Sequence, residues 1–378
     1  MKSIVIGTLL VSLFILFTPV RAGHELPIYP SFYPQEIRIV TVDAREAAAQ
    51  LPKAAIHAYI GPEPAFDSSP PDNVRFVESL GSYLVLSLAP DAAKDRDSRC
   101  TLARTLASTL VTKALPGFRF HPYPITPFHE DYLYHFDLIE AAKAEYQALA
   151  ADSIDRSLSV HPQGKLATRL VQAVAWPVEE KGKVALEEVD VRALLTTQTL
   201  SLNGWINPPW IKQGWFHAYL LLADAISEPA RRRAVDALYQ RLIRGQAEGK
   251  EEQVNIERKL VSQLVEGCER TVVGYTVRRE YYNADFSAGV ENIAFDSHTG
   301  LHAPIFLRTV KLKDFPWNGW LRLGVPTPPS AAWNPVGGFT DPTGRLIWSA
   351  LGDAALFPAP YNGGWLVNRV VDYLFIHR

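Results

Sequence analysis

The sequence predicts an α+β fold, with mixed strands at both ends of the chain, a helical middle section and a long Trp/Pro/Gly-rich C-terminal loop region. Alternating polar and apolar residues near both ends indicate the strands, and apolar residues at helical spacing indicate the helices between them. We expect four parts, of which the last three could also fold as one compact unit. They are a signal peptide over 1–22, an α+β part over 23–165, a mainly helical part over 166–270 and a β-rich part with aromatic loops over 271–378.

The first 22 residues have the features of a cleavable secretory signal. Lys2 precedes an uncharged apolar run over 4–17, and Val20 and Ala22 are the small residues that a cut after Ala22 requires. The run is shorter than the about 20 apolar residues of a spanning helix. We therefore expect cleavage rather than an uncleaved anchor, no membrane span after cleavage, and a periplasmic or secreted protein.

The N-terminal part begins with strands and continues with helices. The strand candidates are 36–42, 54–60 and 74–88. Leucines near one face predict a helix over 91–115, and an irregular loop follows over 116–127. Thr126 and Pro127 are suited to be the N-cap and first residue of a helix that runs to about residue 151.

The remaining expected helices and strands lie in the middle and C-terminal parts of the chain. Residues 166–178 form a strand candidate, and three helices are expected over 207–226, 229–245 and 250–268. Further strands are expected over 271–283, near 292–295 and over 303–312, and the tail from Phe315 is expected to be loop.

Composition limits the classes of partner. The chain is 47% hydrophobic and 21% charged, as is usual for a globular protein. Its net charge of −2 gives no basic surface for nucleic acid or an anionic membrane. The sequence contains no Walker loop, dinucleotide glycine fingerprint or Gly-x-Ser-x-Gly elbow. We expect no nucleic-acid partner and no nucleotide cofactor, and instead a small molecule or an exported partner protein.

Cys100 and Cys268 are the two cysteines, and in an oxidising compartment they most simply form one disulfide. This use excludes thiolate metal ligands, and the absence of Cys-x-x-Cys-His excludes haem c. Met1 is the single methionine, so the mature chain offers no thioether ligand. Any metal site is therefore expected to use imidazole and carboxylate groups.

Asp296, His298 and His302 form the first candidate metal site. In an extended segment all three side chains point to one face, and in a helix the two histidines share a face at i, i+4. Such a set suits a divalent transition metal such as zinc, copper or iron. The alternative is an ordinary turn in which Asp296 bonds to nearby backbone.

His129 and His135 are possible additional ligands, with His121 nearby in the preceding loop. On a helix His129 and His135 lie about 120° apart, whereas Asp131 and His135 share a face at i, i+4. The alternative is an acidic first turn with surface histidines.

Four further residues are candidates for lining a pocket. His217 and Gln213 lie on a segment that is apolar almost all round and therefore buried, and Trp333 and Trp348 lie in the aromatic tail. The alternative is ordinary packing in the core.

These features predict an exported soluble binding or accessory protein that holds a His/Asp-coordinated metal ion. One alternative is a cell-envelope enzyme, a metal-assisted hydrolase or oxidoreductase with an aromatic substrate groove. Another is a purely structural partner of an exported protein. No residue is assigned a catalytic role. The deciding observation is whether His298 and His302 lie near His121, His129, His135 or His217.

Overall fold

The computed structural model describes residues 34, 36–111, 115–147, 158–195, 209–314, 319–330, 339, 341–351 and 356–367. The expected signal peptide over 1–22 and Trp333 lie outside these residues. Among the described helices, none combines the length and apolarity needed to cross a bilayer.

An eight-stranded mixed sheet organises the described residues. Its strands, in spatial order, are β1 (Glu36–Thr41), β10 (Trp320–Val325), β2 (Ala58–Tyr59), β7 (Arg270–Asn283), β3 (Val74–Leu88), β6 (Val184–Asp190) and β5 (Val160–Gln163), with β4 (Phe118–Phe120) also paired to β7. β1 and β10 are parallel, whereas β3 is antiparallel to both β6 and β7. Strands from all three expected parts of the mature chain thus share one sheet.

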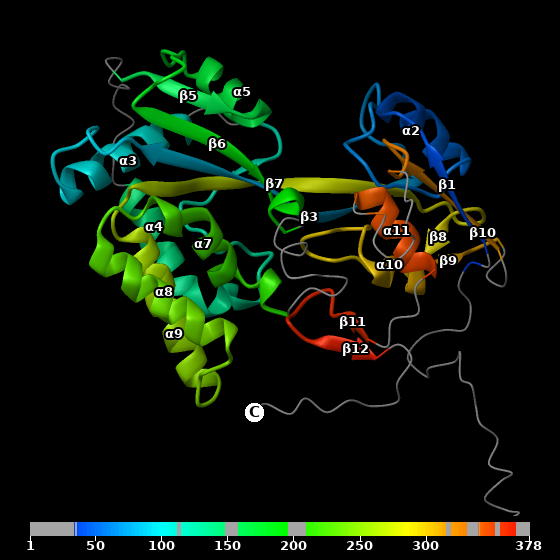
Figure 1. The fold of residues 1–378 in the computed structure, drawn as a ribbon. Coiled ribbons are helices and arrows are strands. Elements are labelled where there is room, and N and C mark those ends of the chain that lie inside the picture. Colours follow the sequence, from blue (N-terminus) through cyan, green and yellow to red (C-terminus); the bar gives the residue numbers. More distant parts are fainter. Residues whose placement is uncertain are drawn as a thin grey trace, which may run out of the picture.

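The long strands β3 and β7 run through two lobes (Figure 1). The first lobe carries β5, β6 and helices α3 (Arg96–Val111), α4 (Phe136–Gln147), α5 (Lys165–Ala173), α7 (Gly214–Leu222), α8 (Pro229–Ile243) and α9 (Lys250–Val265). The second lobe carries β1, β2, β10 and helices α2 (Ala44–Gln50), α10 (Pro304–Thr309) and α11 (Pro342–Leu351).

Short elements complete the two lobes. The 3₁₀ helices are η1 (Leu51–Lys53), η2 (Glu130–His135), η3 (Pro209–Lys212) and η4 (Ala223–Ala225). The two-stranded pairs are β8 (Val290–Glu291) with β9 (Lys311–Leu312), and β11 (Leu356–Pro358) with β12 (Trp365–Val367).

β3 contributes to two cores of the first lobe because its side chains alternate between the faces of the sheet, and its earlier part contributes to a core of the second lobe. Tyr83 and Val85 pack into the core that contains α7 and α9. Leu84 and Leu86 pack into the core that contains α3 and α5. Nearer its start, Val77 belongs to a core of the second lobe. The near-continuous apolar run of β3 therefore follows from burial on both faces.

Several predictions are confirmed by these elements. The chain is α+β, strands occupy 74–88 and 271–283, and helices lie within 229–245 and 250–268. The strand expected over 36–42 ends at Thr41. The helix expected over 91–115 is described over Arg96–Val111.

Two strand predictions are wrong. Residues 166–178 include helix α5, whose buried positions Leu166, Ala167, Leu170 and Val171 follow the helical period. Most of 303–312 is helix α10, which begins at Pro304, a residue suited to the first turn of a helix. The tail from Phe315 is also more regular than expected, because it includes β10 and α11.

Other helices and strands begin or end at residues that differ from the predicted ones. Of 54–60, two residues form β2, and 292–295 follows β8 without being a strand. The helix expected from Thr126 starts later, as η2, and becomes α-helical at Phe136. The reason is a turn in which the Thr126 backbone N–H donates to Nδ1 of His129, at 2.9 Å.

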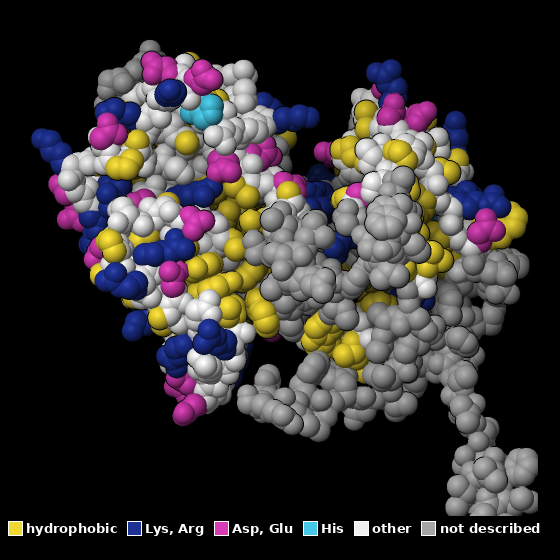
Figure 2. All heavy atoms as spheres, viewed as in Figure 1, with side chains coloured by type: hydrophobic (Ala, Val, Ile, Leu, Met, Phe, Trp, Pro, Cys, Tyr) yellow, Lys and Arg dark blue, Asp and Glu magenta, His cyan; other side chains and the backbone are white. Residues whose placement is uncertain are grey.

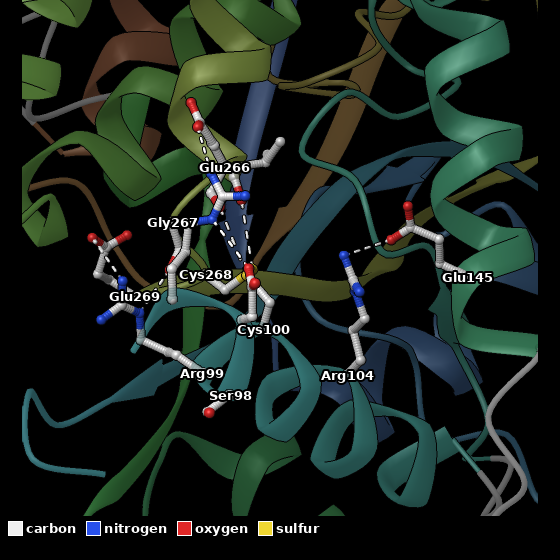
Figure 3. The surroundings of a disulfide bond; sticks show 12 residues. Ser98, Arg99, Cys100, Arg104, Glu145, Glu266, Gly267, Cys268 and Glu269 are labelled. Atoms are coloured by element: carbon white, nitrogen blue, oxygen red, sulfur yellow. Dashed lines mark hydrogen bonds and ion pairs between the residues drawn. A yellow bond between two sulfur atoms is a disulfide. The ribbon is translucent and has the colours of Figure 1, made fainter. Parts of the chain in front are cut away.

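The predicted disulfide between Cys100 and Cys268 is confirmed (Figure 3). It joins α3 to the residues that precede β7. Arg99 reinforces this link, because its Nε donates to the Gly267 carbonyl oxygen at 2.7 Å. The Arg96–Glu266 ion pair, at 2.7 Å, lies beside it.

Candidate metal centre at the lobe junction

His129, His217 and His298 lie together in the interior. Each offers a ring nitrogen, and these three nitrogens lie within 4.8 Å of one another. The ring centroids of His129 and His217 are 4.7 Å apart, and those of His298 lie 5.0 and 5.1 Å from them. All three side chains are buried. Three ring nitrogens this close together could hold a metal ion with nitrogen ligands.

The three histidines come from both lobes. His129 precedes η2, and His217 lies in the first half of α7, so both belong to the first lobe. His298 lies between β8 and α10 of the second lobe. This segment is held to β3 by the Leu80 N–H, which donates to the Ser297 carbonyl oxygen at 2.8 Å. The set therefore forms where the lobes meet.

Hydrogen bonds fix the orientation of two of the three imidazole rings. Nε2 of His217 lies 2.9 Å from the Ile211 carbonyl oxygen and donates to it, which leaves Nδ1 with its lone pair. Nδ1 of His298 lies 2.9 Å from Oγ of Ser297. Nε2 of His298 is buried with no hydrogen-bond partner among the described residues. An unpartnered buried nitrogen is costly unless something binds it.

Tyr83 on β3 offers an alternative to a metal ion, namely a hydrogen-bond network with two of the histidines. Its hydroxyl lies 2.9 Å from Nδ1 of His217 and 3.1 Å from Nε2 of His129. It can donate to the first nitrogen and accept from the second, which satisfies both without an ion. This network leaves Nε2 of His298 unmatched.

Burial keeps the three imidazoles neutral. It lowers the pKa of His217 to about 4 and that of His129 well below its usual range, where the neighbouring His217 adds to the effect. The pKa of His298 is also lowered well below its usual range by burial and then by His129 and His217. Metal binding requires neutral imidazole. For Nε2 of His129 to bind an ion, its ring hydrogen must sit on Nδ1, where the Thr126 carbonyl oxygen lies at 3.2 Å and can accept it.

The predicted trio of Asp296, His298 and His302 is not brought together as ligands. Asp296 pairs with Lys212 and accepts hydrogen bonds from the backbone N–H groups of His298 and Thr299. Nδ1 of His302 lies 3.4 Å from Oε1 of Glu280. Asp296 thus shapes the turn that presents His298, as the alternative interpretation expected.

His135 lies in a second buried group with Asp131 and Glu257, separate from His129. His121 is apart from both groups, and its Nε2 donates to the Ile125 carbonyl oxygen at 2.6 Å. The pocket candidate Gln213 donates to Glu130 at 2.7 Å. The ring of Trp348 contacts Phe339, with the centroids 6.3 Å apart.

Two residues of these groups were missed in the sequence, Tyr83 and Glu257. Tyr83 resembles any aromatic residue of a buried strand, so no local signal marks it. Glu257, in contrast, could have been identified from the sequence. It lies three, four and seven positions before Leu260, Val261 and Leu264, on the buried stripe of α9. A carboxylate within an apolar stripe indicates a specific partner.

An open cavity of about 450 Å³ lies in the first lobe. Tyr123, Tyr146, Gln263 and Cys268 are among its lining residues, and the three histidines are not. Its wall does reach the second buried group, because the Tyr123 hydroxyl lies 3.2 Å from Nδ1 of His135.

No protein-family model matches the chain, and no curated protein matches it. Solved structures with partial similarity include HbpA2 from Haemophilus parasuis, with 10% identity, a TM-score of 0.41, and coverage of 72% of this chain and 57% of that chain. The oligopeptide-binding protein AppA from Bacillus subtilis, in complex with a nonapeptide, has 12% identity, a TM-score of 0.37, and coverages of 71% and 58%. The PBP AgaA from A. tumefacien R10, in complex with agropinic acid, has 10% identity, a TM-score of 0.40, and coverages of 71% and 59%. The chain thus spans less than two thirds of each.

Proposed function

We propose that the protein is an exported binding or accessory protein that holds a divalent transition metal ion, zinc or copper, on His129, His217 and His298. The observation that carries this proposal is the convergence of three buried, neutral imidazoles from both lobes, one of them with an unpartnered nitrogen. The secretory pattern of residues 1–22 supports a location in the periplasm or outside the cell.

The spacing of one nitrogen pair in this set suits such an ion. Zinc–imidazole bonds are about 2.0–2.1 Å long, so two nitrogens in tetrahedral coordination lie about 3.3–3.4 Å apart. Nε2 of His129 and Nδ1 of His217 are 3.3 Å apart. The Ile211 carbonyl fixes the His217 ring from behind, as outer partners of metal-bound histidines do. The Tyr83 hydroxyl, or a small molecule, would supply a further ligand.

The position between the lobes favours a binding role. An ion there would connect a segment of the second lobe to the first. Figure 2 shows hydrophobic side chains gathered on the side of the first lobe that faces the second, with charged side chains mainly on its outer parts. An apolar surface with a few polar groups is typical of small-molecule sites.

The test is a metal titration of the purified chain after treatment with a chelator. We expect Zn²⁺ or Cu²⁺ to bind, and His298→Ala to bind one ion per chain fewer, because it removes the unpartnered nitrogen. His161→Ala is the matched control, since it removes an imidazole on β5 and should bind as the unaltered protein does.

Equal stoichiometry and affinity in His298→Ala and the unaltered protein would contradict the proposal. That outcome would favour the network in which Tyr83 alone satisfies His129 and His217.

A further inference from the structure

A second buried group lies in the first lobe, where η2, α7 and α9 meet. It consists of Asp131, His135 and Glu257, whose ligand atoms lie within 4.8 Å of one another. Asp131 is 1% exposed, and His135 and Glu257 are both 0% exposed. The group shares no residue with the three-histidine set.

Two atoms of this group lack hydrogen-bond partners. Nε2 of His135 and Oε2 of Glu257 are both buried and unpartnered among the described residues. The other atoms of these side chains are engaged, because Nδ1 of His135 meets the Tyr123 hydroxyl and Oε1 of Glu257 accepts from Gln253 at 2.7 Å. The unpartnered atoms are therefore the two that remain for a ligand.

Asp131 is held in place by the start of α7. Its oxygens accept from the backbone N–H groups of Gly214 and Trp215, at 2.8 and 3.1 Å. Each carboxylate oxygen has two lone pairs, so these bonds leave capacity for a cation.

No cationic side chain is paired with this group. Among the described residues, no lysine or arginine forms an ion pair with Asp131 or Glu257, although both carboxyl groups are buried. A buried carboxylate without a paired charge is costly, and that cost is offset either by taking up a proton or by binding a cation.

We propose that Asp131, His135 and Glu257 form a second divalent metal site with one nitrogen and two carboxylate oxygens. This mixed donor set suits zinc, manganese or iron(II), whereas the three-histidine set favours zinc or copper. Tyr123, which lines the 450 Å³ cavity, has its hydroxyl 3.2 Å from Nδ1 of His135 and leaves Nε2 of that ring for the ion. This inference does not depend on the function proposed above.

The test uses His298→Ala as the parent, because that change removes a ligand of the first site only. We expect the parent to bind one Zn²⁺ per chain and to show a higher melting temperature with added Zn²⁺, since the ion binds the folded state. Adding Glu257→Gln should abolish both the binding and the rise. Glu251→Gln, an exposed change on the same helix, is the control and should preserve both.

A second readout separates loss of the site from loss of the fold. The amide of Glu257→Gln removes the buried charge and can donate to Nε2 of His135. In the absence of metal, this variant should therefore melt no lower than its parent.

Two outcomes would overturn the proposal: a parent that binds no ion, or equal Zn²⁺ binding with and without Glu257→Gln. The first would mean that a shared proton or an ordered water satisfies the group. Failure of the three-histidine site is distinguishable, because it would appear as equal binding in the parent and the unaltered protein.

Discussion

Asp296 and His298 lie two residues apart and have different roles. Both belong to a polar run that indicates metal ligands, but Asp296 is engaged by Lys212 and two backbone N–H groups. Nε2 of His298 is unpartnered instead. The residue types were visible in the sequence, whereas Lys212, which pairs with Asp296, lies 84 positions away. Local spacing could therefore identify His298 but could not assign the ligand set.

The histidines outside the two groups also affect stability. Burial lowers the pKa of His121 from its ordinary 6.5 to about 4, against the opposing effect of the Ile125 carbonyl. The folded protein thus keeps His121 neutral while the unfolded chain binds a proton. The free energy of unfolding is unaffected above pH 6.5 and falls, by up to about 3 kcal/mol from this group, as the pH decreases toward 4.

We expect His121→Gln to reduce this acid sensitivity. Glutamine can donate to the Ile125 carbonyl in place of the ring but does not titrate between pH 4 and 7. Urea unfolding at several pH values would measure the slope, which should fall by up to about 1.4 kcal/mol per pH unit. An unchanged slope would show that His121 does not contribute.

At the scale of elements, the long strands and helices were predicted correctly from the sequence, whereas short apolar segments were assigned to the wrong type of secondary structure. β3 and α9 extend over 15 and 16 residues, long enough for their periods to be distinct. α10 has six residues, too few to separate a helical period from a strand. Its assignment depends on the second-lobe core into which Phe306 and Leu307 pack.

Helix α2 begins with a capping box whose contribution to stability can be tested by mutation. Asp43 accepts from the backbone N–H groups of Arg45 and Glu46, both at 2.8 Å, and Glu46 accepts in return from the Asp43 N–H at 3.0 Å. We expect Asp43→Ala to lower the free energy of unfolding by about 1 kcal/mol, because it removes this capping box. Urea denaturation would measure it, with Asp43→Asn as the control that keeps an accepting oxygen. Equal loss in both variants would point to charge rather than capping.

At the scale of the whole molecule, the sheet order could not be deduced from the sequence. β10 inserts between β1 and β2 although about 260 residues separate it from β2. No local pattern encodes such a pairing. The disulfide was predictable because two cysteines allow one pairing.

That disulfide should contribute strongly to stability. Cys100 and Cys268 are 168 residues apart in sequence, and closing such a loop is worth up to about 5 kcal/mol in the chain-entropy model. We expect Cys100→Ala with Cys268→Ala to lower the urea midpoint markedly. Adding a reductant should shift the unaltered protein toward the double variant and leave the double variant itself unmoved. Coincident midpoints before reduction would contradict this expectation.

The pairing of β3 with β7 also sets the order of events during synthesis. About 180 residues separate the end of β3 from the start of β7. At about 5–20 residues per second, a ribosome needs roughly 10–40 seconds to make them. β3 lacks its longest partner for that whole interval, and pairings so distant in sequence form slowly even afterwards. A nascent chain that carries the expected leader would thus stay open long enough for export machinery to engage it before the two lobes are joined.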